Sequence, residues 1–169
     1  MSTLRAREKI DEGECELSSF TADDYLMAAK ERRVDISNVS NKKDSLVFTA
    51  YAAGVSVECI LRHNIKKRTD SFDSCHDLRN LLIESQILVG LEYPIQKKIL
   101  ELIVQINQRW QNNLRYGSIK RTKRILAHEL ANKKQHIAQG ILESYYTDII
   151  SKCEQFVKLG NQYGFAKTN

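Results

Sequence analysis

The stretch from Ala50 to Arg62, which reads AYAAGVSVECILR, decides the fold of this chain. Small and apolar residues recur in it and just before it at three- and four-residue steps: Val47, Ala50, Gly54, Val57 and Leu61. This spacing is the period of an α-helix with a buried side. We therefore expect a helix that begins near Asp44 and is followed by a basic, polar connection over residues 66–74.

Glu58 lies on the same side of this predicted helix as Tyr51, Gly54 and Leu61. A carboxylate on a buried side must accept hydrogen bonds, pair with a cation or face a second chain, because burying it alone is costly. Glu58 is therefore a candidate functional residue, and a purely structural role is the alternative.

Two shorter helices are predicted on either side of this stretch. Thr21 is a good N-cap for a helix that we expect to end at about Arg33, before a polar linker over 37–43. A second short helix is expected over 76–82. Its cap is expected to be one of two polar residues, Asp73 or Ser74.

Two longer helices are predicted in the second half of the chain. Residues 86–93 are expected to form a loop, because Pro94 suits the first turn of the next helix. The apolar stripe of that helix consists of Ile95, Ile99, Leu102, Ile106 and Trp110. The final helix is expected to start near His136 and to end near Gly160. Its predicted buried residues are Ile137, Ile141, Tyr145, Ile149 and Phe156.

These patterns predict an all-α fold, an antiparallel bundle of four to five helices. One proline and seven glycines in 169 residues are too few for a chain of tight hairpins. We expect a flexible N-terminal arm over 1–17, which is charged and non-periodic, and a single helical domain over 18–165.

Composition and motifs narrow the class of protein. Apolar runs fall short of the ~20 residues that cross a membrane, and no signal peptide is evident, so we expect a soluble, cytoplasmic protein. The four cysteines form no close pair, which argues against a structural metal and for reduced thiols. Phosphate-binding glycine loops, zinc-hydrolase histidine pairs and Gly-x-Ser-x-Gly elbows are missing from the sequence, so we expect no cofactor.

A basic segment between residues 120 and 134 is the candidate contact with RNA, which the net charge of +5 permits but does not require. Its candidate RNA-binding residues are Lys120, Lys123, Arg124, Lys133 and Lys134. Arg121 and His128 within it form a candidate catalytic pair. A histidine can move the proton of an attacking 2′-hydroxyl, and an arginine can stabilise the charge on the phosphate. The alternative is that His128 lies on a solvated helix surface.

Four segments, in order along the chain, match motifs of one family: 20–26, 50–62, 76–82 and 110–116. In them the chain resembles bacterial HEPN-domain proteins, whose apolar second helix carries a glycine followed four residues later by a glutamate. Gly54 and Glu58 match that pattern, His76-Asp77-Leu78 is similar to the family's His-Asp-Leu helix start, and Trp110 precedes an Arg-Tyr element. The resemblance covers residues 20–160.

The resemblance implies a helical bundle, homodimerisation and a role in toxin–antitoxin pairs or phage defence. Many HEPN proteins are metal-independent ribonucleases with an Arg-x(4–6)-His motif, whose spacing Arg121 and His128 match. The pair departs from the family pattern because it lies well after Arg115 and Tyr116.

Three hypotheses follow. The first is a HEPN-type protein that acts on or binds RNA. The second is a non-catalytic HEPN module that binds a nucleotide or a partner protein such as a nucleotidyltransferase. Its candidate binding residues are Glu58, His76, Asp77, Arg115 and Tyr116. The third is a purely structural dimerisation bundle.

Overall fold

The computed structural model describes residues 20–39, 46–69, 76–110 and 141–166, and all regular structure in these ranges is helical. The described helices are α1 (Ala22–Val39), α2 (Leu46–Thr69), α3 (Leu78–Ser85), α4 (Tyr93–Arg109) and α6 (Ile141–Tyr163). The prediction of an all-α helical bundle is confirmed. The arm expected over 1–17 lies outside the described residues.

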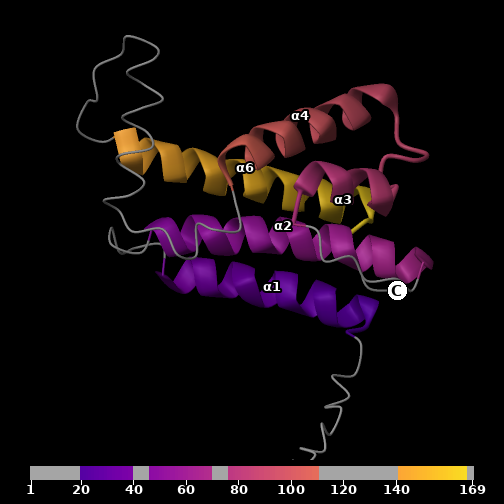
Figure 1. The fold of residues 1–169 in the computed structure, drawn as a ribbon, viewed down its shortest axis with the longest axis horizontal. Coiled ribbons are helices and arrows are strands. Elements are labelled where there is room, and N and C mark those ends of the chain that lie inside the picture. Colours follow the sequence, from indigo (N-terminus) through magenta and orange to yellow (C-terminus); the bar gives the residue numbers. More distant parts are fainter. Residues whose placement is uncertain (1–19, 40–45, 70–75, 111–140, 167–169) are drawn as a thin grey trace, which may run out of the picture.

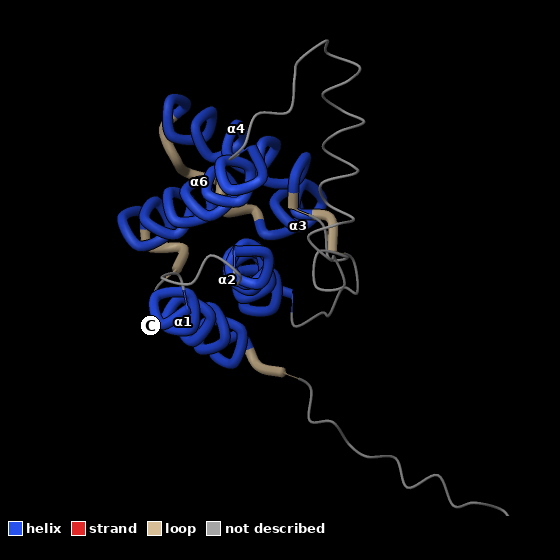
Figure 2. Tube along the Cα trace, turned by 90° about the vertical axis from the view of Figure 1, so that its left-hand side faces the viewer, coloured by secondary structure: helices blue, strands red, loops and turns tan. Residues whose placement is uncertain are grey.

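Helix α2 is the centre of the bundle (Figures 1 and 2). It packs against α1, α3 and α6, and α4 covers α6 and α3 from the other side. Figure 1 shows that α1 runs opposite to α2, and α4 runs opposite to α6. Among the described helices, none combines the length and the apolar composition that crossing a lipid bilayer requires.

The start of α1 was predicted correctly and its end was not. The Thr21 hydroxyl accepts a hydrogen bond from the Asp24 amide at 3.2 Å, and Asp24 Oδ2 accepts one from the Thr21 amide at 2.8 Å. This reciprocal pair satisfies two free donors of the first turn. The helix continues past Arg33 to Val39, because Ile36 is buried and extends the packed side of α1.

Helix α2 is buried on most of its circumference rather than along one stripe. Small side chains such as Ala50, Ala52 and Ala53 let the neighbouring helices approach it closely. The helix extends to Thr69, so the connection expected from residue 66 begins later. His63, near the C-terminal end of α2, is buried, and its Nδ1 donates to the Ala22 carbonyl at 2.7 Å.

The apolar stripe predicted on α4 is confirmed: Ile99, Leu102, Ile106 and Trp110 are buried, and Ile95 is partly buried. The loop expected before it is also confirmed, since residues 86–92 form turns. The predicted start of the last helix at His136 lies outside the described residues.

The end of α6 lies beyond the predicted Gly160. A Cβ on Gly160 would come within 2.9 Å of both Phe165 and Ala166, so the glycine is a packing contact and not a stop. The turn falls at Gly164, whose φ of +84° suits a glycine. Tyr145 was expected in the core, but Tyr146 takes that place and Tyr145 is only half-buried.

Candidate functional site

Glu58 is a buried carboxylate in the middle of α2, with 7% of the residue exposed. Arg62, one turn further along, is equally buried, and its Nε donates to Glu58 Oε1 at 2.8 Å. A buried ion pair persists only where further hydrogen bonds offset the loss of hydration. The geometry around Glu58 supplies such a bond.

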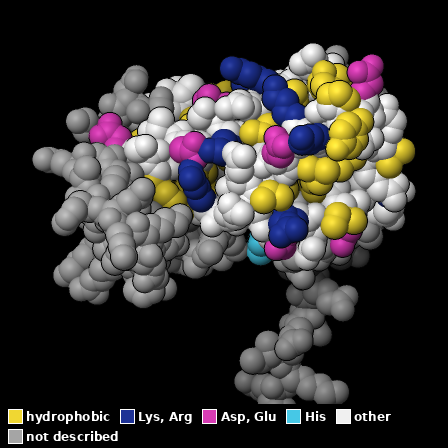
Figure 3. All heavy atoms as spheres, turned by 90° about the horizontal axis from the view of Figure 1, so that it is seen from above, with side chains coloured by type: hydrophobic (Ala, Val, Ile, Leu, Met, Phe, Trp, Pro, Cys, Tyr) yellow, Lys and Arg dark blue, Asp and Glu magenta, His cyan; other side chains and the backbone are white. Residues whose placement is uncertain are grey.

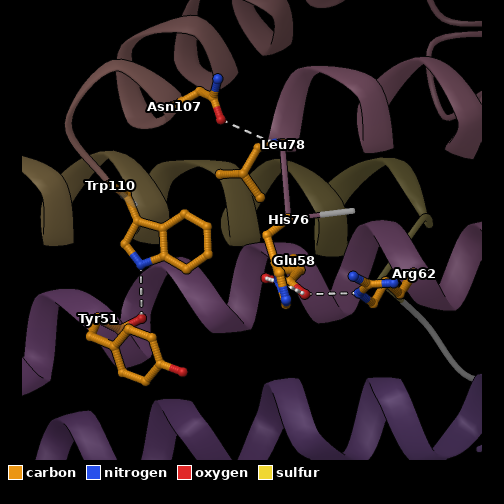
Figure 4. Close-up of polar contacts among 7 residues, drawn as sticks. All are labelled: Tyr51, Glu58, Arg62, His76, Leu78, Asn107 and Trp110. Carbon is orange, nitrogen blue, oxygen red and sulfur yellow. Dashed lines mark hydrogen bonds and ion pairs between the residues drawn. The ribbon is translucent and has the colours of Figure 1, made fainter. Parts of the chain in front are cut away.

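His76, directly before α3, supplies it. Its Nδ1 lies 3.0 Å from Oε1 and 3.2 Å from Oε2 of Glu58 (Figure 4). Because an ionised carboxylate only accepts hydrogen bonds, Nδ1 is the donor. The His76 side chain is 48% exposed, and its Nε2 has no hydrogen-bond partner among the described residues. A solvent-facing imidazole oriented by a buried carboxylate can bind an acidic group or exchange a proton.

Asp77 is the N-cap of α3. Its Oδ1 accepts hydrogen bonds from the amides of Arg79 at 2.9 Å and Asn80 at 3.0 Å. These bonds, the one from the Asn80 amide most of all, lower the pKa of the Asp77 carboxyl from its usual value. The prediction that Asp73 or Ser74 would cap a helix over 76–82 was therefore wrong, because Asp77 provides the cap and the helix runs from Leu78 to Ser85.

Asn107 of α4 locks this helix start in place. Its Oδ1 accepts a hydrogen bond from the Leu78 amide at 3.1 Å (Figure 4). Its Nδ2 donates to Asp77 Oδ2 at 3.4 Å. The backbone that carries His76 is thus fixed between α2 and α4. Helical spacing gave no sign of this contact, because the two segments are far apart in the sequence.

Gly54 and Trp110 form the neighbouring contact. A Cβ on Gly54 would lie 2.0 Å from Trp110 Nε1, so only glycine admits the indole ring at this point of α2. The indole Nε1 donates to the Tyr51 carbonyl at 3.1 Å, and the Trp110 and Tyr51 rings stack with centroids 6.4 Å apart. Trp110 therefore pins the end of α4 to α2, one helical turn before Glu58.

Two further titratable side chains near Glu58, Cys59 and Tyr25, are held in their neutral forms by burial. Burial raises the pKa of the Cys59 thiol to about 11, with a smaller contribution from the negative charge of Glu58. Burial also raises the pKa of Tyr25, whose buried hydroxyl has no hydrogen-bond partner among the described residues. Neither group is ionised near neutral pH. Throughout the described ranges, no group of three His, Cys, Asp or Glu side chains is placed to hold a metal ion.

A second surface feature lies where α3 joins α4. Figure 3 shows hydrophobic side chains gathered toward one end of the molecule. The large exposed hydrophobic residues of α3, α4 and the turn between them are Ile83, Val89, Tyr93 and Leu100. Exposed apolar patches of this kind mark contacts with other proteins.

The structure thus brings together three of the residues selected from the sequence: Glu58, His76 and Asp77. Arg62 was missed as a member of this cluster, although its position four residues after Glu58 is the spacing of a helical ion pair. The remaining selected residues lie outside the described ranges: Arg115, Tyr116, Lys120, Arg121, Lys123, Arg124, His128, Lys133 and Lys134.

Comparison of the chain with protein-family models, with curated proteins and with solved structures found no match.

Proposed function

We propose that this chain is a HEPN-type helical module that acts on or binds RNA, as a homodimer and as a component of a toxin–antitoxin or phage-defence system. One observation carries the proposal: motifs that resemble that family separately in the sequence meet in one place. Gly54 receives Trp110, and Glu58 receives His76 of the His-Asp-Leu segment. A shared fold, unlike a chance match of short sequence segments, requires the matching segments to pack against one another.

The proposed chemistry is metal-independent cleavage of RNA by Arg121 and His128. The histidine takes the proton of a ribose 2′-hydroxyl, whose oxygen attacks the adjacent phosphorus. The bond to the 5′-oxygen breaks, which leaves a 2′,3′-cyclic phosphate and, after protonation of the leaving oxygen, a 5′-hydroxyl. The arginine stabilises the charge that develops on the phosphate oxygens.

The test is cleavage of tRNA and total RNA by the purified full chain in the presence of a chelator. We expect fragments that end in a cyclic phosphate, and a loss of rate of about 100-fold or more in His128→Ala and Arg121→Ala. His136→Ala is the matched control, because it removes a histidine close by in the sequence, and it should cleave like the wild type. Equal cleavage by His128→Ala would remove that residue from the mechanism.

The second candidate function is binding of a nucleotide or a partner protein without catalysis. Two observations favour it: the exposed imidazole edge of His76 on the buried Glu58, and the exposed apolar side chains of Ile83, Val89, Tyr93 and Leu100 on α3, α4 and the turn between them. For the nucleotide, calorimetric titration with ATP should show binding that weakens about 10-fold in His76→Ala. Arg79→Ala, an exposed neighbour, is the control. Equal affinities for wild type and His76→Ala would exclude this residue from the site.

A further inference from the structure

A groove with a volume of about 630 Å³ lies between α1 and α6. It exists because both helices pack against α2 but make few contacts with each other. The volume falls within the range of about 300–1,000 Å³ that is typical of sites for small molecules. The groove is separate from the Glu58 cluster, since none of Glu58, Arg62 and His76 lines it.

The floor of the groove suits an aliphatic chain. It is lined by Ala53 and Ser56 of α2 and by Cys153 and Val157 of α6. The Ser56 hydroxyl donates to the Ala53 carbonyl at 2.6 Å, so its proton is already used inside the helix. Full burial raises the pKa of the Cys153 thiol well above its usual value, so the sulfur stays protonated and apolar.

The rim of the groove is positively charged on the α1 side. Lys30 and Arg33, one helical turn apart, line it there, and the exposed Val34 lies beside them. Within the described ranges, neither cation forms an ion pair. Glu154 of α6 is the single acidic residue among those that line the groove. Two cations next to an apolar floor complement a ligand with an anionic head and an apolar body.

We propose that this groove binds a medium-chain carboxylate, with its aliphatic chain along the floor and its carboxylate against Lys30 and Arg33. The arginine side chain offers a planar fork of donors that matches a carboxylate, and the lysine adds a second charge. Each methylene group that enters the floor should tighten binding about 4-fold.

The experiment is calorimetric titration of the full chain with decanoate, octanoate and the uncharged decanol. Decanoate should bind at least about 10-fold more tightly than octanoate, because two more methylene groups enter the floor. It should also bind more tightly than decanol. Arg33→Glu should weaken decanoate about 10-fold while leaving decanol unchanged, because only the charged head is affected. Val34→Asp, at an exposed lining position, should weaken both. Lys97→Glu reverses an exposed charge on α4 and is the control, with unchanged binding.

Size-exclusion chromatography of the same variants distinguishes other occupants. The proposal is overturned if decanoate does not bind, or if Arg33→Glu and Lys97→Glu weaken it equally. It is also overturned if the wild type is a dimer that Val34→Asp converts to a monomer, because a second copy of the chain then covers the groove. Circular dichroism of each variant shows that the helices are retained.

Discussion

Replacement of Gly54 by alanine is the sharpest test of how α2 and α4 are joined. The added methyl group would lie 2.0 Å from Trp110 Nε1 and 2.2 Å from Cδ1 and Cε2 of the same ring. These distances are far below any van der Waals contact, so the indole must move. Trp110 is 1% exposed and its Nε1 donates to the Tyr51 carbonyl, so moving the ring disturbs a buried, hydrogen-bonded side chain.

The magnitude follows from opposing contributions. Glycine to alanine inside a helix stabilises by about 1 kcal/mol on its own. Against this, overpacking a core costs about 1–3 kcal/mol, and a broken hydrogen bond that leaves a buried group unsatisfied costs about 1–3 kcal/mol. We expect Gly54→Ala to lower the free energy of unfolding by a net of about 1–5 kcal/mol. The upper end of this range is comparable to the roughly 3–5 kcal/mol typical of deleting a buried tryptophan.

The assay is urea unfolding followed by circular dichroism, in the wild type and in a Trp110→Leu background. With the indole removed, Gly54→Ala should become neutral or stabilising by up to about 1 kcal/mol, because only the helix propensity remains. The reasoning is refuted if Gly54→Ala is harmless in the wild type, or if it costs the same in both backgrounds.

Further predictions concern the cluster and the thiols. Glu58→Ala should destabilise by about 3–5 kcal/mol in urea unfolding, because it removes the carboxylate that pairs with the buried Arg62 guanidinium; a cost below 1 kcal/mol would contradict the ion pair. Asp77→Ala should cost about 1 kcal/mol at neutral pH through loss of the α3 cap. Since folding lowers the pKa of Asp77, this contribution is complete above the carboxyl's usual pKa of about 4 and is lost as the pH falls through the lowered folded value. If the difference in the free energy of unfolding between the wild type and Asp77→Ala grew as the pH falls, this prediction would be contradicted. A thiol reagent at pH 8 should leave Cys59 and Cys153 unmodified in the folded protein and label them in urea, and fast labelling without urea would argue against their burial.

The features predicted well from the sequence are those that local spacing determines. Helix α4 has one exposed and one buried side, so the three- and four-residue spacing of its apolar residues is visible in the sequence. Thr21 and Asp24 cap α1 within one turn, and Pro94 lies in the first turn of α4, where the preceding loop ends. These contacts depend on residues a few positions apart.

The features that were missed depend on tertiary neighbours. His63 is buried because Ala22, 41 residues earlier, meets it in the fold. Glu58 was recognised as unusual, but its contact with His76 depends on how α3 is placed by Asn107 of α4. The end of α1 lies beyond Arg33 because Ile36 is buried in the core. The polar residues around Ile36 in the sequence gave no indication of this burial.

Binding of RNA is the most direct test of the proposed function. Fluorescence anisotropy of a labelled single-stranded RNA should show affinity that falls as salt is raised from 50 to 200 mM, because each phosphate contact releases counterions. Alanine at Lys120, Lys123, Arg124, Lys133 and Lys134 together should weaken binding and flatten its dependence on salt. Absence of binding at 50 mM salt, or identical binding by this variant, would contradict the assignment of that segment to RNA.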